Sequence, residues 1–289
     1  MSNPIDPFSP SLPGPLVGPG SQPQDADGGT LEYMQMPEGM MTFAAPDLPE
    51  PEETTGLENG LAVLDQLLES LETFTTTDAP ARHDLTHLDP KNLDLVNQVL
   101  GEGEVSVIGG SQIQAQEAVL AGVWRVRRSA DGDQAEADYI EAGVFPSEIL
   151  ETVFKDAQDH VVMPEKAGPN IFNAPPLIPE INEHLGIPRK TGVPHVINLS
   201  LLPHTEEDLT FLNERLGRGS VTILSRGYGN CRITSTQTAD TWWVQYYNSQ
   251  DSLILNTIEI SPVPDVACAA SEDIADSAER LGEILEVYR

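Results

Sequence analysis

The sequence predicts an α+β fold of two pseudo-symmetric repeats, each a helix followed by an antiparallel β-meander, with a disordered acidic N-terminal tail and a C-terminal helix. One ordered series of residues occurs twice, at a constant spacing of 116 residues. In both copies the helix is followed by residues that alternate between apolar and polar, as in antiparallel strands with one wet face. The matched series are Leu93, Val96, Asn97, Leu100, Gly101, Gly103, Val105 and Val107 in the first copy and Leu209, Leu212, Asn213, Leu216, Gly217, Gly219, Val221 and Ile223 in the second.

Later landmarks extend the match, with a spacing that changes only where a turn would change length. Val123-Trp124 matches Trp242-Trp243 at a spacing of 119 residues, and Ile140-Glu141 matches Ile258-Glu259 at a spacing of 118. An ordered recurrence of this kind indicates internal duplication.

The chain is long enough for two modest cores, because compact domains usually contain roughly 100–200 residues and this chain has 289. Five parts are predicted. They are a disordered Pro/Gly/acid-rich tail at 1–56, an acidic amphipathic helix at 57–75, the first repeat at 82–150, a Pro-rich connector at 151–195, and the second repeat with the C-terminal helix at 196–289.

The tail is predicted to be disordered because its composition leaves too little apolar area to offset the entropy of ordering. One segment of it, from Tyr33 to Phe43, holds four of the six methionines of the chain. Methionine side chains adapt to irregular apolar surfaces, so this segment is expected to dock, either on a partner or on the folded part of its own chain. The candidate contact residues are Met34, Met36, Met40 and Met41.

The helix at 57–75 is predicted from leucines spaced alternately four and three residues apart, with acidic residues on another side. Its leucines are expected either to pack on the sheets or to contact a partner, and the candidates for a partner are Leu61, Leu64 and Leu68. The C-terminal helix repeats this spacing from Ile274 to Tyr288, with Ser271 as its expected N-cap. This helix is expected to pack on the sheets.

Each repeat is predicted to contain a helix, at 91–100 or 207–216, followed by a glycine that suits a left-handed C-terminal position. Strands follow, separated by turn sequences such as Asp131 to Asp133 and Asn248 to Asp251. Before each helix, residues 83–88 align with 197–202, an apparent strand. Seven prolines from 164 to 194 indicate a connector with one short helix after Pro179.

The formal charge of −31, from 46 acidic and 15 basic residues, argues against nucleic acid as a partner, because a phosphate backbone would be repelled. Anionic membrane surfaces are disfavoured for the same reason, and no apolar run approaches the ~20 residues that would insert as a spanning helix. Residues 1–81 contain no Lys or Arg, so no basic secretion signal is visible and a cytoplasmic location is expected. Cys231 and Cys268 lie 37 residues apart and are expected to be reduced thiols.

Motifs that could carry chemistry are weak. His83 and His87 have the spacing of two zinc ligands on a helix, but their segment aligns with an apparent strand. They are therefore expected to share a strand face and to bind no metal. Gly227 and Gly229 lack the GxGxxG form and are expected to lie in a hairpin turn.

Cys231 follows this turn between Arg226 and Arg232, where nearby cations would favour a thiolate. A half-buried strand cysteine is the preferred interpretation, because neither a CxxC partner nor a fixed His–acid pair is visible. The candidate partner-binding residues of this region are Arg226, Gly227, Tyr228, Gly229 and Cys231. No catalytic residue, cofactor or metal site is predicted, so the chain is expected to be a binding or chaperone protein and not an enzyme.

Five sequence segments together resemble the HupH/HyaF family of hydrogenase expression/formation proteins. The resemblance covers roughly 82–289 and is fainter from Tyr33 to Glu53. The ordered set is specific, although each segment alone is not. The segments are Leu100–Val107, Gly122–Arg128, His195–Leu199, Arg226–Gly229 and Pro264–Leu281.

The resemblance implies an accessory role in maturing a membrane-bound uptake nickel–iron hydrogenase. It implies that the protein binds the iron–sulfur small-subunit precursor in the cytoplasm before twin-arginine export. It also implies a thioredoxin-like companion of the HupG/HyaE type and protection of assembly from oxygen. An acidic chain would attract the basic signal peptide of such a precursor, and the helix at 57–75 or the methionine segment is the expected contact.

Two alternatives stay open at this point. One is a thiol-dependent factor that handles or protects iron–sulfur clusters through Cys231. The other is a non-catalytic scaffold that joins the small subunit and the thioredoxin-like companion.

Overall fold

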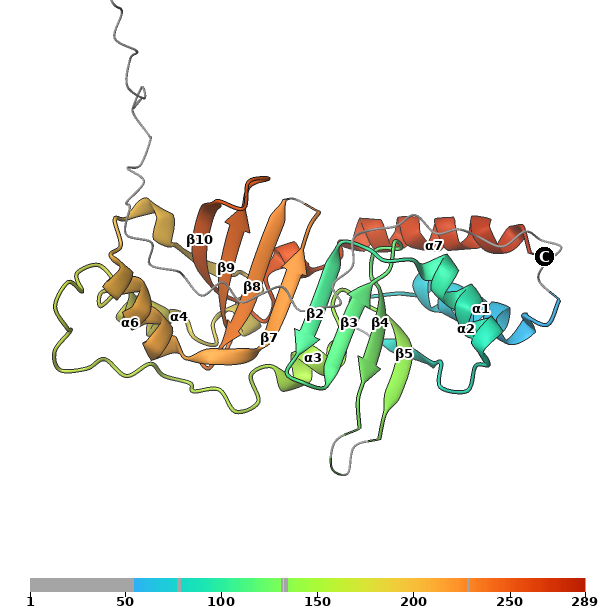
Figure 1. Ribbon diagram of the computed structural model, residues 1–289, viewed down its shortest axis with the longest axis horizontal. Coiled ribbons are helices and arrows are strands. Elements are labelled where there is room, and N and C mark those ends of the chain that lie inside the picture. The colour runs from blue at the N-terminus through green and yellow to red at the C-terminus, as the bar shows by residue number, and fades with distance from the viewer. Residues whose placement is uncertain (1–54, 77–78, 131, 133–134, 228, 289) are drawn as a thin grey trace, which may run out of the picture. The chain divides into compact units, whose positions relative to one another are not determined.

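The computed structural model describes residues 55–76, 79–130, 132, 135–227 and 229–288. Ten strands in these ranges form one sheet, in the order β1-β5-β4-β3-β2-β7-β8-β9-β10-β6, with every neighbouring pair antiparallel (Figure 1). The strands are β1 (Ala81–Asp84), β2 (Val105–Gly109), β3 (Ile113–Glu117), β4 (Val123–Arg128), β5 (Ala137–Ala142), β6 (His195–Asn198), β7 (Arg218–Ser225), β8 (Asn230–Thr236), β9 (Thr241–Tyr247) and β10 (Leu253–Ile260). The helices are α1 (Glu58–Glu72), α2 (Pro90–Leu100), α3 (Ser147–Thr152), α4 (Leu177–His184), α5 (Pro188–Thr191), α6 (Glu206–Leu216) and α7 (Ser271–Glu286), with short 3-10 turns η2 (Leu199–Leu201) and η3 (Asp265–Ala267).

The two halves of the sheet have the same order of elements. In the first half, β1 and α2 precede the meander β2-β3-β4-β5, and in the second half, β6 and α6 precede β7-β8-β9-β10. The predicted α+β class, with antiparallel strands and a C-terminal helix, is confirmed. The duplication of sequence and the five domain boundaries stay predictions, and the predicted tail lies almost wholly outside the described residues.

The halves meet where β2 pairs with β7, so they lie side by side in one sheet. Val107 is opposite Ile223, and these two residues are 116 positions apart. Val105 is opposite Ser225, and Gly109 is opposite Val221. This register is the one that a two-fold axis through the Val107–Ile223 pair requires.

The two buried tryptophans correct one detail of the sequence alignment. Trp124 is opposite Glu141 and Trp242 is opposite Glu259, so the equivalent positions are 118 residues apart and not 119. Each indole N–H donates to a carbonyl just after the neighbouring strand, at 3.0 Å to Gly143 and 3.1 Å to Ser261. Trp243 therefore lies on the opposite face, because successive strand residues alternate between faces.

The main helix of each half begins one residue before its predicted start and ends at the predicted residue. Pro90 follows the N-cap Asp89, whose carboxylate accepts from two backbone N–H groups, and α6 begins with a capping box between Thr205 and Asp208. Both helices end at a glycine with positive φ, 54° at Gly101 and 67° at Gly217. With ψ near ±160°, these conformations are essentially restricted to glycine.

Three apolar clusters cover the sheet. One packs α1, α2 and α7 against the first half, and a second packs α4 and α6 against the second half. The third runs across the β2–β7 junction, since it contains both tryptophans as well as Val107 and Ile223. Burial of this shared face stabilises the contact between the halves in addition to the β2–β7 pairing.

Several predicted elements differ from the structure at their ends. The strand expected at 83–88 ends at Asp84, because that carboxylate accepts from the backbone N–H and hydroxyl of Thr86 and closes a turn. The strand expected at 197–202 likewise gives way to η2 after Asn198. Ala270, and not Ser271, is the N-cap of α7. The connector helix begins at Leu177, before Pro179, and α3 and α5 were not predicted.

Candidate functional site

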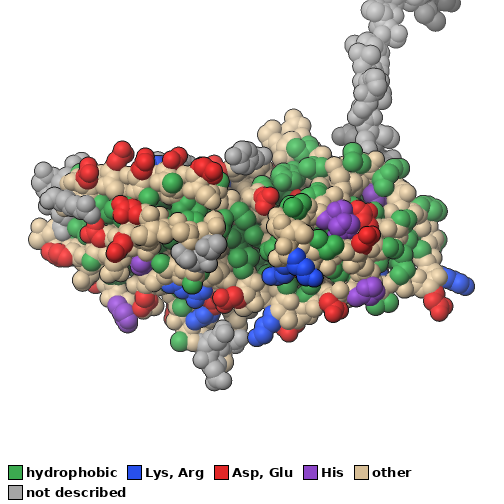
Figure 2. All heavy atoms as spheres, turned by 180° about the vertical axis from the view of Figure 1, so that it is seen from behind, with side chains coloured by type: hydrophobic (Ala, Val, Ile, Leu, Met, Phe, Trp, Pro, Cys, Tyr) green, Lys and Arg blue, Asp and Glu red, His purple; other side chains and the backbone are tan. Residues whose placement is uncertain are grey.

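The outer faces of α1 and α7 form an acidic surface, which we call the acidic face. The two helices pack side by side, and Leu68 of α1 lies against Gly282 of α7, where a Cβ atom would be 4.0 Å from its methyl groups. The two helices carry ten exposed carboxylates and one base, Arg280, and Figure 2 shows acidic side chains along this part of the molecule. The acidic residues are Glu58, Asp65, Glu69 and Glu72 on α1 and Glu272, Asp273, Asp276, Glu279, Glu283 and Glu286 on α7.

Towards the C-terminal ends of α1 and α7, the charges of the acidic face disfavour the helices. Glu69 lies three residues before Glu72, and Glu279 lies four residues before Glu283, so like charges are neighbours on the helix surface. Neither helix has a basic residue in its last turn, where a cation would favour the helix dipole. A cationic partner would relieve both effects, so this surface fits a basic polypeptide.

The leucines of α1 face inward. Leu64 and Leu68 belong to the core that α1, α2 and α7 share, and Leu61 packs partly buried against it. Hence these leucines hold the helix in place, and the exposed side of α1 is its acidic side. The prediction that Leu61, Leu64 and Leu68 touch a partner stays untested, but such contact would require α1 to leave the core.

One buried carboxyl group lies beneath the beginning of α7. Burial raises the pKa of Glu117 to about 7, with smaller contributions from the charges of Glu104 and Asp273. The backbone N–H of Gly122 donates to its carboxylate at 3.2 Å. Glu117 is therefore a group near the acidic face whose charge changes around neutral pH.

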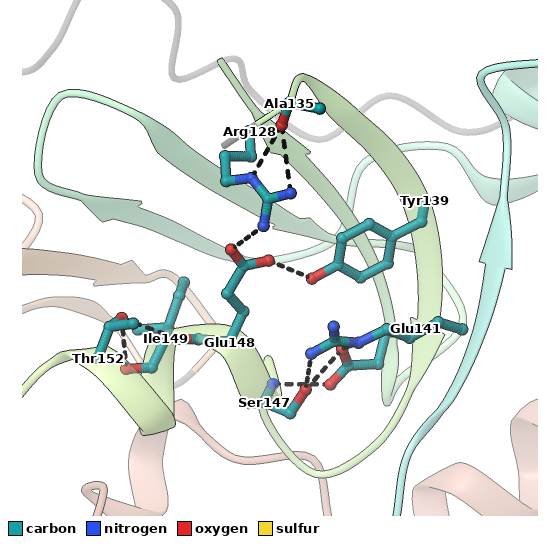
Figure 3. A network of polar contacts seen from close by, with 9 residues as sticks. Arg128, Ala135, Tyr139, Glu141, Ser147, Glu148, Ile149 and Thr152 are labelled. Carbon is teal, nitrogen blue, oxygen red and sulfur yellow. Dashed lines mark hydrogen bonds and ion pairs between the residues drawn. The ribbon is translucent and has the colours of Figure 1, made fainter. Parts of the chain in front are cut away.

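A second polar arrangement lies on the face of the first half that α3 covers (Figure 3). Glu141 is fully buried and accepts from the backbone N–H and hydroxyl of Ser147 at 2.7 and 2.8 Å. Arg82 on β1 donates to the same carboxylate at 3.1 Å. Beside this group, Glu148 accepts from Arg128 and from the Tyr139 hydroxyl, which burial and the carboxylate together hold at a raised pKa.

The corresponding positions of the second half carry different side chains. Glu259 stands where the first half has Glu141, and its cross-strand neighbour is Val196 where the first half has Arg82. Burial raises the pKa of Glu259, the Thr257 hydroxyl donates to it at 3.2 Å, and the charge of Asp265 adds to the upward shift. This half therefore holds a carboxyl group without the arginine that its counterpart has.

Cys231 lies on the same face, next to Tyr246 on the neighbouring strand. Burial raises the pKa of its thiol to about 12, and the charge of Glu259 acts in the same direction. The flanking Arg232 points to the opposite face of β8 by the alternation of the strand. The lowered thiol pKa that the flanking arginines suggested is therefore not found, and Cys231 is a buried strand cysteine.

The predicted hairpin after β7 is confirmed, since Ser225 and Cys231 pair across it. In its loop, the backbone of Arg226 donates to the carbonyl of Glu104 at 3.1 Å, and Gly227 lies against the Glu104 carboxylate. The loop thus contacts the segment before β2. Tyr228 and the methionine segment with Met34, Met36, Met40 and Met41 lie outside the described residues, so their predicted role in partner binding is untested.

His83 and His87 do not share a strand face. His83 lies in β1 and contacts the Ser70 hydroxyl at 3.0 Å, whereas His87 lies in the following turn beside Asp84. Within the described ranges, no group of three His, Cys, Asp or Glu side chains is placed to hold a metal ion. None of the helices in those ranges is both long and apolar enough to cross a membrane.

The sequence pattern identified Glu141 and Glu259 only as landmarks of the repeat and did not predict that Glu141 is buried and Glu259 half-buried. The available signal was an acidic residue at the same place in two otherwise half-apolar strands. A buried acid in such a strand needs a polar or charged partner. The residue opposite is the cation Arg82 in the first half, whereas in the second half it is the apolar residue Val196.

The chain matches a known protein family in sequence. The sequence profile of the "HupH hydrogenase expression protein, C-terminal conserved region" matches residues 57–161 and 171–288. The chain is 46% identical over 278 residues to the hydrogenase expression/formation protein HoxQ of Cupriavidus necator, covering 95% of this chain and 96% of that protein.

Two further relatives are similar over nearly their whole length. The hydrogenase expression/formation protein HupH of Rhodobacter capsulatus is 44% identical, covering 96% of this chain and 98% of that protein. The hydrogenase-1 operon protein HyaF of Escherichia coli K12 is 32% identical, covering 94% and 95%. A solved structure, the hydrogenase expression protein HupH of Thiobacillus denitrificans, is 33% identical and covers 38% of this chain and 92% of that chain, with a TM-score of 0.36.

Proposed function

Because this chain belongs to the HupH family of hydrogenase expression/formation proteins, and so takes part in hydrogenase maturation, we propose that it binds the precursor of an iron–sulfur small subunit before that subunit is exported by the twin-arginine route. In this proposal the protein is a non-catalytic chaperone that acts in the cytoplasm. Its relatives are named for expression and formation of hydrogenases, which supports an accessory role.

The observation that carries the proposal is the acidic face of α1 and α7. A twin-arginine signal peptide is basic, and ten carboxylates against one base on two neighbouring helices would attract it. At physiological ionic strength such attraction reaches about 8 Å, so it acts chiefly on encounter and orientation. Tight holding would need apolar contacts in addition, and the methionine segment from Tyr33 to Phe43 is our candidate for them.

The thiol-dependent alternative has less support. A thiol acts as a nucleophile or metal ligand in its deprotonated form, and burial opposes that form at Cys231. The scaffold alternative, with a thioredoxin-like companion of the HupG/HyaE type bound at the same time, is compatible with the chaperone proposal, because the acidic face occupies only the helices packed on the first half.

The proposal is tested by neutralising part of the acidic face. We expect the quadruple variant Glu69→Gln, Glu72→Gln, Glu279→Gln, Glu283→Gln to bind the purified small-subunit precursor about 10-fold more weakly at 50 mM salt, mainly through a slower association rate. At 300 mM salt, screening should shrink the difference between the variant and the wild type.

A control variant removes the same number of charges elsewhere. Glu151→Gln, Asp156→Asn, Glu214→Gln and Asp251→Asn replace exposed acids outside α1 and α7. We expect this control to bind within about two-fold of the wild type, since distant surface charges contribute little. Equal weakening by both variants would mean that net charge, and not the acidic face, attracts the precursor.

A further inference from the structure

Glu141 and Glu259 occupy the same place in the two halves, but only one of them has a cation. In the first half, β1 pairs with β5 so that Arg82 is directly opposite Glu141. In the second half, β6 pairs with β10 in the same antiparallel register, and Val196 is directly opposite Glu259. Residues that are directly opposite share a face of the sheet, so the two pairs occupy equivalent positions in the two halves.

The first half shows what a complete site of this kind contains. The Nε atom of Arg82 donates to Glu141 at 3.1 Å, and its Nη2 atom donates to the Ser147 hydroxyl at 2.6 Å. The guanidinium also lies 5.0 Å from the centre of the Tyr139 ring. The guanidinium thus neutralises the charge of the carboxylate, and the Ser147 hydroxyl accepts from the guanidinium and donates to the carboxylate.

The second half lacks the neutralising groups. Ser147 is the first residue of α3, the helix after β5, whereas Asp265 is the first residue of η3, the turn after β10. Asp265 follows Glu259 by six residues, as Ser147 follows Glu141, so a carboxylate takes the sequence position of the Ser147 hydroxyl, and its charge contributes to the raised pKa of Glu259. Among the ion pairs of the described residues, none involves Glu259.

The residue at the position of Arg82 in the second half, Val196, is short and apolar. Val196 is 49% exposed on β6, which is an edge strand of the sheet. Further exposed apolar side chains lie in the chain just before β6, at Val193, and just after it, at Leu201 and Leu202. The opposite edge, β1, instead presents Arg82 and Asp84, as protected sheet edges commonly do. An unprotected apolar edge is a surface on which another polypeptide can lie.

We infer that Glu259, with Asp265 beside it, is a binding site for an arginine side chain of a partner polypeptide that lies along β6, so that the partner's guanidinium takes the place that Arg82 holds in the first half. Arginine fits better than lysine, because its planar guanidinium can donate two parallel hydrogen bonds to a carboxylate. The partner's apolar residues would cover Val196 and its exposed neighbours.

The chain's own N-terminal segment cannot supply this cation from a side chain. Residues 1–81 contain no Lys or Arg, and of the other undescribed residues only Arg289, three positions after the last residue of α7, is basic. The α7 helix packs on α1 and the first half. The arginine is therefore expected from another polypeptide, and the site does not depend on whether that polypeptide is the small-subunit precursor.

The test uses the full-length protein and two short peptides, acetyl-Thr-Val-Arg-Val-Thr-amide and the same peptide with citrulline, an uncharged isostere of arginine. Affinities are measured by NMR titration, with the carboxyl carbon of Glu259 as a direct reporter. We expect the arginine peptide to bind at least about 10-fold more tightly, as for a charge-assisted hydrogen bond that is partly shielded from water. The Glu259 signal should shift with the arginine peptide only.

Three variants locate the effect. Glu259→Gln should abolish the preference for arginine, while Asp251→Asn, which removes one negative charge from the exposed turn before β10, should keep it. Val196→Arg places an arginine in cis where Arg82 stands in the first half, so it should weaken peptide binding about 10-fold and lower the pKa of Glu259 measured by NMR. Val196 is exposed, so this variant is expected to fold.

Equal affinity for the two peptides would overturn the inference, as would an arginine preference that survives Glu259→Gln. Saturable binding of calcium ions at Glu259 and Asp265 without any arginine preference would make this a metal site and would also overturn it. Because neither peptide contains hydrogenase sequence, failure here leaves the proposed binding of the precursor untouched.

Discussion

Glu117 shows how a single buried group can make this protein sensitive to pH. Its pKa is raised from 4.5 to about 7, mainly by burial, so the folded protein binds a proton more tightly than the unfolded chain does. The stability that this carboxyl group contributes is fully present below about pH 4.5 and is lost as the pH rises through 7. The loss amounts to at most about 3 kcal/mol, from ~1.4 kcal/mol for each pH unit of the shift.

We therefore predict that Glu117→Gln gains stability relative to the wild type as the pH rises from 5 to 8. Glutamine is neutral and of the same shape, and it still offers an oxygen to the Gly122 N–H. The measurement is urea unfolding of both proteins at several pH values. Glu136→Gln, at an exposed glutamate, is the control for loss of one negative charge, and a pH-independent gap between Glu117→Gln and the wild type would contradict the burial argument.

At the residue scale, the sequence predicted which element a residue belongs to better than it predicted what surrounds its side chain. It placed Cys231 in a strand as a half-buried residue. A thiol pKa lowered by the flanking arginines was only the less favoured alternative, and it stayed open because a sequence does not show on which face each side chain lies. Alignment of the two halves matched Val123-Trp124 with Trp242-Trp243, because the second half has two adjacent tryptophans and Trp124 can be aligned with either of them. The cross-strand pairs Trp124–Glu141 and Trp242–Glu259 settle the offset at 118.

At the scale of elements, α1 has two chemically different faces. Its leucines pack it against α2 and α7, and its acidic side is exposed. A binding defect caused by leucine substitutions would therefore report on folding of the helix. Substitutions of the exposed acidic residues test the proposed binding without disturbing the core.

We predict that Leu64→Ala lowers the free energy of unfolding by about 2–5 kcal/mol, because the side chain is fully buried and its removal leaves a cavity. Gln66→Ala, at an exposed position of the same helix, should stay within about 0.5 kcal/mol of the wild type. Thermal and urea unfolding measure both. The prediction is contradicted if the Leu64→Ala protein is as stable as the wild type. If that protein also failed to bind the precursor, the leucine side of α1 would be the contact surface.

Helices and meander strands could be predicted because their signals are local. Asp89-Pro90, the capping box from Thr205 to Asp208 and the glycines 101 and 217 mark helix ends in the sequence itself. The short helices α3 and α5 have no such signal, since six or four residues show little periodicity. The predicted strand at 83–88 was too long, because the turn that Asp84 makes with Thr86 depends on a side-chain hydrogen bond.

At the scale of the whole molecule, the pairing of β2 with β7 was beyond sequence reasoning. Both strands alternate between apolar and polar residues, and such a pattern says that one face is buried without saying which strand lies alongside. The partners are 116 residues apart, and no turn fixes their register. The observed register, centred on Val107 and Ile223, places the two meanders in one sheet and leaves β1 and β6 as its edges.

The single sheet separates two chemically different surfaces. The acidic face lies on helices packed against the first half, and the apolar edge with Glu259 belongs to β6 and β10 in the second half. The two surfaces use different residues and can be altered independently. A protein that assists assembly could therefore hold a basic segment at one surface while a second polypeptide lies at the other.

The most direct test of the central claim is co-purification from cells that express the matching hydrogenase, with this protein as bait and the bound chains identified by mass. We predict recovery of the small subunit with its signal peptide still attached, and loss of that recovery when the signal peptide is deleted. Recovery of the small subunit at the same level without its signal peptide would contradict a role for the acidic face in binding the signal peptide. Absence of any hydrogenase chain, while mature hydrogenase still depended on this protein, would contradict the proposal that it holds the precursor.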